Sequence, residues 1–170
     1  MEKRELFMEK LDRNILKLLY RNAKLNAEDI AVLLGEDVNL IAVKIKEMEQ
    51  QGYIRGYKAV VDWDKTDSTY VSAIIQLKVT PKAGLGFEEI AEKVMKYPEV
   101  ETVYLMSGVY DLHVVVKGKT FQQVAMFVAK ELSTIEAVNS TATHFVLRRY
   151  KEFEVELVNT DTDDRGNFLL

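Results

Sequence analysis

A change in hydrophobic period at Gly52 constrains this sequence more than any other feature. Before Gly52, apolar residues recur every three or four positions, as they do on one face of a helix. After it, β-branched and aromatic residues gather in short runs, several of which alternate with polar residues as half-buried strands do. The 170-residue chain is therefore expected to hold two small domains, one helical and one built on a sheet.

Three helices are predicted before Gly52. Asn26 and Asp37 are good N-cap residues for the second and third helices, and Gly35 suits the left-handed residue that ends the second helix. A very short glycine-containing turn between two helices is typical of a helix-turn-helix, whose second helix enters the major groove of DNA. The inward stripes expected of the three helices are Leu11, Ile15, Leu18 and Leu19; Ala27, Ile30, Ala31 and Leu34; and Val38, Ile41, Ile45 and Met48.

The second half is predicted to run strand, helix, strand, strand, helix, strand. Helices are expected to begin at Phe87 and at Phe121, the latter behind a capping box of Thr120 and Gln123. This βαββαβ order is the ferredoxin-like arrangement, an antiparallel sheet with both helices on one face, so the fold class is α+β. The other face is partly apolar, and we expect a second copy of the chain to cover it in a homodimer. The strands are expected at residues 71–80, 101–106, 111–117 and 141–157.

The expected domain boundaries follow from these patterns. Residues 1–56 form the winged helix-turn-helix domain, residues 57–69 a linker strand and hinge, residues 70–158 the ferredoxin-like domain and residues 159–170 a mobile tail. Residues 53–62 are rich in aromatic and β-branched side chains and are strand-like. This strand is either part of the linker or a hairpin wing on the helical domain.

Composition excludes several classes of protein. The chain has no cysteine, which removes disulfides and thiol catalysis and fits a cytoplasmic location. No stretch approaches the roughly 20 apolar residues of a membrane span, and the charged start of the chain does not look like a secretory signal. Residues 1–60 hold 11 basic and 10 acidic residues, a net charge of +1, and residues 61–170 hold 12 and 17, a net charge of −5. Binding to phosphates would therefore depend on local placement of charge.

Three stretches, in order, resemble the Lrp/AsnC (feast/famine) family of transcription regulators over residues 10–152. They are Leu11–Leu19, Asp29–Gly35 with Gly52 seventeen residues further on, and the turn Ser107-Gly-Val-Tyr-Asp111. The resemblance implies a helix-turn-helix that holds double-stranded DNA, joined to a domain that assembles the oligomer and senses an amino acid or similar small metabolite. It also implies dimers that associate into tetramers or octamers and bind a palindromic operator.

The outward face of the third helix is the expected DNA contact. Lys44 and Lys46 are placed to meet phosphates, and Asn39 is the candidate for reading an adenine edge. Asp37 stands where the family usually has Ser, and Val43 where it often has Arg, so the face is less basic than usual. A sensor of the same fold that does not bind DNA therefore remains an alternative. The complete predicted set is Asn26, Asp37, Asn39, Leu40, Val43, Lys44 and Lys46.

The turn from Ser107 to Asp111 is the expected effector site. Gly108 lets a ligand approach its backbone N–H closely, and Asp111 could accept a charge-assisted hydrogen bond from an α-ammonium group. The alternative is that Asp111 merely caps its own turn. The complete predicted set is Ser107, Gly108, Tyr110, Asp111, Thr141 and Thr143.

No catalytic machinery is visible in the sequence. His113 and His144 are the only histidines and have no partner at metal-ligand spacing, so we expect them to be structural or surface residues. No Ser-His-Asp set, phosphate loop or paired acid motif is present. We expect no catalytic residue, metal or cofactor and no enzymatic activity. A less favoured alternative is an enzyme like the sirohaem decarboxylases, which resemble this family in fold and are expected to need His and Arg groups around a tetrapyrrole.

Overall fold

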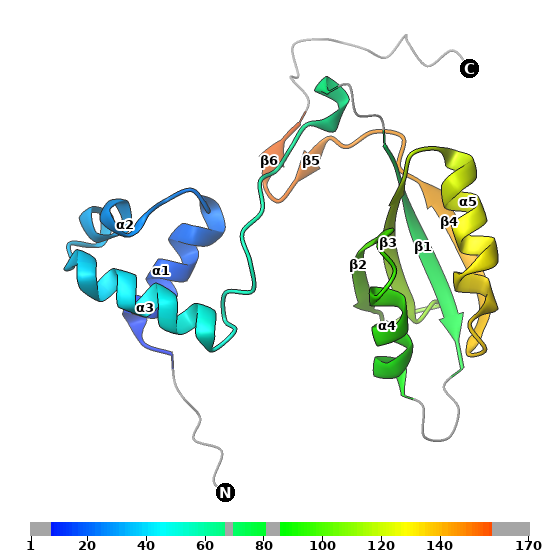
Figure 1. Cartoon of the computed structure of the whole chain (residues 1–170), viewed down its shortest axis with the longest axis horizontal. Coiled ribbons are helices and arrows are strands. Elements are labelled where there is room, and N and C mark those ends of the chain that lie inside the picture. Colours follow the sequence, from blue (N-terminus) through cyan, green and yellow to red (C-terminus); the bar gives the residue numbers. More distant parts are fainter. Residues whose placement is uncertain (1–7, 67–69, 81–85, 158–170) are drawn as a thin grey trace, which may run out of the picture. The chain divides into compact units, whose positions relative to one another are not determined.

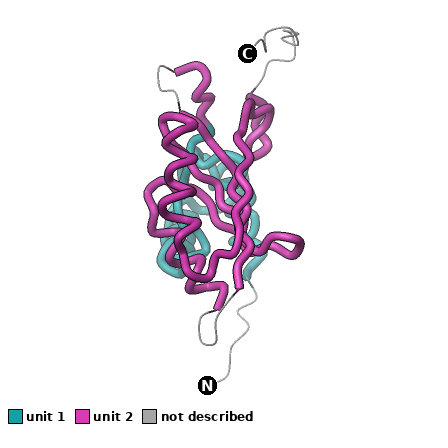
Figure 2. Tube along the Cα trace, turned by 90° about the vertical axis from the view of Figure 1, so that its right-hand side faces the viewer, with its two compact units in different colours: residues 1–60 teal, residues 61–170 magenta. Residues whose placement is uncertain are grey.

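The chain divides into two compact units, residues 1–60 and residues 61–170 (Figure 2). The computed structural model describes residues 8–66, 70–80 and 86–157. The division lies within the stretch 57–69 that the sequence suggests as a hinge. The predicted tail, residues 159–170, lies outside the described residues.

Unit 1 is a three-helix domain, as predicted (Figure 1). Its helices are α1 (Lys10–Arg21), α2 (Ala27–Leu34) and α3 (Val38–Gln50). Each helix contributes one fully buried isoleucine to a common core, which explains why the inward stripes recur at helical spacing. The buried core residues are Ile15, Leu19, Ile30, Ala31, Ile41 and Met48.

The turn between α2 and α3 is fixed at both ends by local hydrogen bonds. Gly35 ends α2 in the left-handed region, with φ +70°, which a glycine adopts without steric cost. Asp37 then caps α3, because its Oδ1 accepts hydrogen bonds from the backbone N–H groups of Asn39 (2.9 Å) and Leu40 (3.1 Å). These two residues determine where α2 stops and where α3 starts.

Residues 53–62 were expected to be strand-like, and this prediction is wrong for the described structure. They belong to no strand, and a short 3-10 helix, η1 (Trp63–Lys65), follows them. The side chain of Tyr57 lies against α3, where its hydroxyl donates to Glu49 Oε1 at 2.8 Å. Aromatic and β-branched residues favour a strand only where a neighbouring strand pairs with it, and none among the described residues does so here.

Unit 2 contains the predicted ferredoxin-like sheet. Its strands are β1 (Val71–Val79), β2 (Val100–Leu105), β3 (Leu112–Gly118) and β4 (Val138–Phe145), in the order β2-β3-β1-β4 with every pair antiparallel. The helices α4 (Phe87–Met95) and α5 (Phe121–Lys130) connect them, and η2 (Leu132–Thr134) follows α5. Figure 1 shows both α-helices lying along the sheet.

Both helices cover the same face of this sheet. Alternate residues of β1 and β3 point to that face and are buried there, among them Ile75, Leu77 and Val114. Ile90 of α4 and Val124 of α5 belong to the same core. The opposite face has no described helix over it, so its side chains stay accessible in the single chain.

The prediction of one long last strand at residues 141–157 is wrong. β4 ends at Phe145, and the chain then forms a separate hairpin of β5 (Lys151–Glu152) and β6 (Val155–Glu156). Phe153 and Glu154 form the turn with φ +46° and +67°. Positive φ at both central residues reverses a two-residue hairpin, and a sequence without glycine or asparagine there gives no warning of it.

Candidate functional site

The outward face of α3 carries four of the predicted DNA-binding residues together. Asn39 and Lys46 are exposed, and Leu40 and Val43 are 41% and 53% exposed. They lie on the side of α3 away from the buried residues Ile41 and Met48. A helix held in this way by a short turn, with polar and apolar side chains outward, has the form that enters a major groove.

Lys44 does not lie on that face, so its predicted placement is wrong. Its ammonium nitrogen lies 2.8 Å from Glu9 Oε2 and 2.9 Å from Asp12 Oδ1, and the side chain is only 15% exposed. The hydrogen bonds to Glu9 and Asp12 raise the pKa of Lys44 above its ordinary value. Lys44 therefore ties α3 to α1 by ion pairs, and its charge is already balanced within unit 1.

Asn26 and Asp37 use their side-chain oxygens to cap helices. Asn26 Oδ1 accepts from the Asp29 N–H at 2.7 Å, and Asp29 in turn accepts from the Asn26 N–H at 3.2 Å, which completes a capping box. Asp37 caps α3 through its side-chain oxygen alone, without a reciprocal bond. These contacts give both residues a structural role, and contact with DNA stays a prediction for them.

The turn from Ser107 to Asp111 is closed by backbone hydrogen bonds. The N–H of Met106 donates to the carbonyl oxygen of Asp111 at 2.7 Å, and the N–H of Asp111 donates to the carbonyl oxygen of Leu77 at 2.9 Å. Ser107 and Gly108 are exposed and Tyr110 is half-buried. A Cβ atom added to Gly108 would meet no atom within 4 Å. Packing within the described chain thus does not require a glycine at this position.

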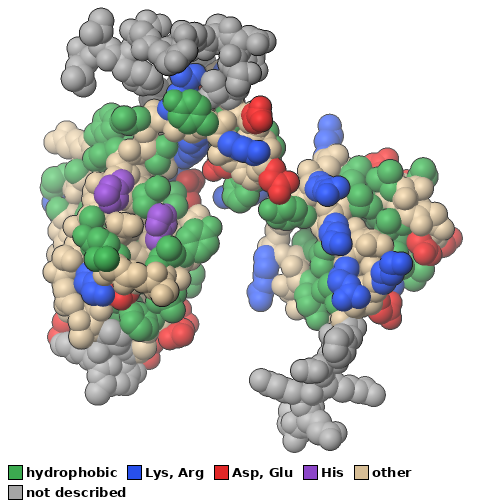
Figure 3. Space-filling view, turned by 180° about the vertical axis from the view of Figure 1, so that it is seen from behind, with side chains coloured by type: hydrophobic (Ala, Val, Ile, Leu, Met, Phe, Trp, Pro, Cys, Tyr) green, Lys and Arg blue, Asp and Glu red, His purple; other side chains and the backbone are tan. Residues whose placement is uncertain are grey.

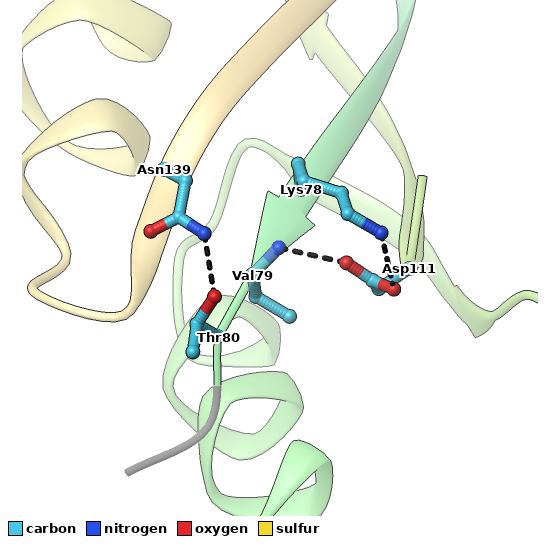
Figure 4. Close-up of polar contacts among 5 residues, drawn as sticks. All are labelled: Lys78, Val79, Thr80, Asp111 and Asn139. Carbon is cyan, nitrogen blue, oxygen red and sulfur yellow. Dashed lines mark hydrogen bonds and ion pairs between the residues drawn. The ribbon is translucent and has the colours of Figure 1, made fainter. Parts of the chain in front are cut away.

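Asp111 is held at the end of β1 by two partners (Figure 4). Its Oδ2 accepts from the backbone N–H of Val79 at 2.9 Å, and its Oδ1 lies 3.1 Å from Lys78 Nζ. The Val79 hydrogen bond, with a contribution from Lys78, lowers the pKa of this carboxyl below its ordinary value. Both carboxylate oxygens already have partners, which fits the alternative structural role for Asp111.

The structure does not bring Thr141 and Thr143 to Asp111. In the register of β4 with β1, Thr141 lies opposite Leu77 and Thr143 opposite Ile75, so both threonines share the helix-covered face. The partner of Asp111, Lys78, follows Leu77 and points to the other face. The predicted effector residues therefore do not converge on one site within a single chain.

Two polar residues beside this turn were missed by sequence reasoning. Asn139 Nδ2 donates to Thr80 Oγ1 at 2.6 Å, next to the β-bulge where the pairing of β1 and β4 shifts (Figure 4). Their position depends on that bulge, and a bulge inserts an extra residue that no hydrophobic alternation reveals. A hollow of about 260 Å³ lies at the opposite end of the sheet, lined by Tyr70, Pro98, Glu99, Lys117, Gly118, Lys119 and Gln123.

The helix-free face of the sheet carries both histidines of the chain (Figure 3). His113 lies between Tyr104 and Gln76, and His144 lies opposite Ile74. The face is thus a mixture of apolar, aromatic and polar side chains, and Lys78 and Lys117 add positive charge to it. No group of three metal-ligating side chains occurs among the described residues. Within the same part of the chain, no helix is long and apolar enough to cross a membrane.

Comparison with known proteins agrees with this geometry. The family described as "Lrp/AsnC ligand binding domain" matches residues 72–155, and that described as "Winged helix-turn-helix DNA-binding" matches residues 8–55. The HTH-type transcriptional regulator YugG of Bacillus subtilis is 44% identical over 155 residues, covering 91% of this chain and 93% of that protein. The regulator FL11 of Pyrococcus furiosus is 31% identical over 145 residues, covering 85% and 93%.

Solved structures show the same two-domain fold. An AsnC family regulator from Agrobacterium tumefaciens superposes with a TM-score of 0.68 at 26% identity, covering 85% of this chain and 94% of that one. AsnC of E. coli superposes with a TM-score of 0.64 at 24% identity, covering 85% and 95%. The helix-turn-helix of unit 1 and the antiparallel sheet of unit 2 agree with the family to which these relatives point. The chain belongs to the Lrp/AsnC family of DNA-binding transcription regulators with a ligand-binding domain.

Proposed function

We propose that this regulator recognises a palindromic operator through the outward face of α3. We also propose that an amino acid or similar metabolite, bound at the sheet domain, changes its affinity for that operator. The observation that carries the first part is the shared outward face of Asn39, Leu40, Val43 and Lys46. The amide of Asn39 can hydrogen-bond to the edge of an adenine, and Lys46 can contact a phosphate. The apolar side chains of Leu40 and Val43 can contact thymine methyl groups.

The operator is palindromic in this proposal because the protein is a homodimer, extended to a tetramer or octamer. The helix-free face supports the dimer: it exposes part of Ile74, Val115 and Tyr104 in the single chain, and a second copy would bury them. A two-fold dimer presents two copies of α3, and therefore two half-sites related by the same symmetry.

The effector site is proposed at the turn of Ser107, Gly108 and Tyr110, with Asp111 and Lys78 at its base. The turn is exposed, Gly108 leaves its backbone uncovered, and Lys78 offers an ammonium group for a carboxylate. Thr141 and Thr143 would have to come from another copy or take no part. One fold relative, NMB0573 of Neisseria meningitidis, was solved as an L-Met complex, which supports an amino acid as the class of effector. In this proposal the protein acts in the cytoplasm and is not an enzyme.

A second candidate function is a sensor of the same fold that does not bind DNA. One observation favours it: Lys44 is neutralised by Glu9 and Asp12, which leaves Lys46 as the one cation of the described outward face of α3. Electrostatic attraction to phosphates dominates non-specific affinity for DNA. A single lysine on that face supplies little of this electrostatic attraction.

Selection of duplexes from a random pool with the full chain separates the two functions. The regulator is expected to enrich a palindromic sequence, and gel shifts of that duplex should change when one of the twenty amino acids is added at millimolar concentration. The sensor is expected to enrich no sequence, yet to show a thermal shift with one amino acid, since a ligand that binds the folded state raises its stability.

A further inference from the structure

Five basic side chains form a row along α1 and the turn that follows it: Lys10, Arg13, Lys17, Arg21 and Lys24. All five are exposed, and none of the ion pairs found among the described residues involves any of them. This basic row holds five of the nine Lys and Arg residues described in unit 1. A unit that is close to neutral in total charge therefore concentrates its uncompensated positive charge on one surface (Figure 3).

Helical geometry places the basic row on the side of α1 away from the core. Positions 10, 13, 17 and 21 recur at three- and four-residue spacing and so share one face. Ile15 and Leu19, which α1 buries, lie on the opposite face. From Lys10 to Arg21 the row runs eleven residues, roughly 16 Å at 1.5 Å per residue. Measured along the axis of the duplex, that length corresponds to about five phosphates of one strand.

The basic row and the outward face of α3 point in different directions. Ile15 and Leu19 of α1 belong to the same core cluster as Ile41 and Met48 of α3. Each helix exposes the side opposite to that shared core. A straight duplex held against α3 is therefore separated from the basic row by the body of the domain.

We propose that the basic row binds the phosphate backbone of a second segment of duplex DNA, distinct from the operator segment held by α3. The inference rests on the proposed binding of DNA through α3. In this arrangement the row offers five positive charges to the second segment, whereas α3 offers only Lys46 to the operator segment. Tyr20, 73% exposed and on the flank of the row, adds a ring and a hydroxyl beside the phosphates.

Duplex DNA fits this surface better than a membrane does. An amphipathic helix that lies in a membrane inserts its apolar face among the lipids, whereas the apolar face of α1 is already buried in the core of unit 1. What remains outward is a line of cations, which is complementary to a line of phosphates. Binding of this kind is independent of base sequence and depends steeply on salt.

A two-duplex capture assay with the full chain tests the proposal. A selected duplex of about two helical turns is immobilised, and a fluorescent duplex of random sequence is offered with the protein. Three double variants are compared with the wild type: K17Q/R21Q in the basic row, N39A/K46Q on α3, and K93Q/K96Q at the exposed C-terminal end of α4 as a charge-matched control. Circular dichroism confirms that each variant is folded.

We expect K17Q/R21Q to hold the selected duplex as the wild type does and to lose capture of the fluorescent duplex about tenfold or more. The slope of log K against log salt for the random duplex should fall by about two, one for each phosphate contact removed. N39A/K46Q should lose its preference for the selected duplex and keep binding random DNA, and K93Q/K96Q should behave as the wild type.

Four results would overturn the proposal. The wild type could capture no second duplex, or K17Q/R21Q could capture it as well as the wild type. K17Q/R21Q could weaken binding of the selected duplex itself, which would place the basic row on the operator segment. The wild type could bind anionic vesicles through this row and no second duplex. If instead N39A/K46Q keeps full preference for the selected duplex, the assignment of α3 is wrong while the basic row can still hold DNA.

Discussion

Lys44 of α3 and Asp12 of α1 form an ion pair with a nitrogen-to-oxygen distance of 2.9 Å, and their side chains are 15% and 20% exposed. Replacing Lys44 with Met removes this pair and the pair with Glu9. We expect unit 1 to lose roughly 1 kcal/mol of stability, the upper range for such partly exposed pairs, measured as a lower midpoint of chemical unfolding. The salt dependence of DNA binding should not change, because Lys44 is already neutralised.

Lys46→Met is the matched control on the same helix. Lys46 is exposed and has no ion pair among the described residues, so its loss should leave stability unchanged. It should lower the slope of log K against log salt by about one. Reversed results, with Lys44 affecting the salt slope and Lys46 affecting stability, would show that Lys44 leaves its carboxylate partners to meet DNA.

Asp111→Asn tests the anchor at the end of β1. A carboxylate whose pKa is lowered on folding stabilises the folded state above its unfolded pKa, and this contribution disappears as the pH falls through the lowered folded pKa. The pKa of Asp111 is lowered from 3.8, first by the Val79 N–H and then by Lys78. The variant should therefore unfold at a lower temperature than the wild type near neutral pH.

The difference in unfolding temperature should shrink as the pH falls below about 4, since the wild-type side chain then becomes neutral as well. Glu92→Gln, an exposed change on α4, controls for the general loss of one negative charge. A difference between Asp111→Asn and the wild type that stays constant down to strong acid would mean that the charge of Asp111 contributes nothing.

Ile74→Glu tests the helix-free face as the dimer surface. Ile74 lies in the middle of that face, between Val115 and His144 in the register of the sheet. Burying a charged carboxylate in an interface is costly, so sedimentation should show dissociation of the dimer to monomers. Val109→Glu, in the 80% exposed position of the neighbouring turn, should leave the dimer intact. Equal behaviour of both variants would remove the sheet face from the interface.

Gly108→Val tests the effector turn. A Cβ at this position would meet no atom within 4 Å, so the variant should fold as the wild type does. If a ligand approaches the Gly108 N–H, the added branch should weaken its binding at least tenfold in titration calorimetry, while affinity for the selected duplex without ligand stays the same. An unchanged affinity for the amino acid would place the effector elsewhere.

The elements that could be predicted from the sequence are those that depend on residues close together in the chain. The stripes around Ile15, Ile30 and Ile41, the glycine at position 35 and the cap at Asp37 each depend on neighbouring residues, and all are present in the structure. The βαββαβ order could be predicted for the same reason, because alternation in β1 reports which face of the sheet is buried.

Features that depend on distant partners could not be predicted. Lys44 was placed outward by its spacing on α3, but Glu9 and Asp12 of α1 draw its ammonium group inward. Thr141 and Asp111 looked like neighbours, but the register of β4 puts Thr141 on the other face of the sheet from Lys78. Positive φ at Phe153 and Glu154 reverses a chain that alternation alone would continue as one strand.

The central claim is that α3 reads a specific DNA sequence, and competition binding with Asn39→Ala tests it most directly. The full-length wild type is titrated with a fluorescent selected duplex at fixed ionic strength, against an unlabelled duplex of scrambled sequence. We expect the wild type to prefer the selected duplex by about 10³-fold or more, and Asn39→Ala to lose about 1–3 kcal/mol of that preference while its affinity for the scrambled duplex stays the same. Equal affinity of the wild type for both duplexes, or an unchanged preference for the selected duplex in Asn39→Ala, would contradict the account.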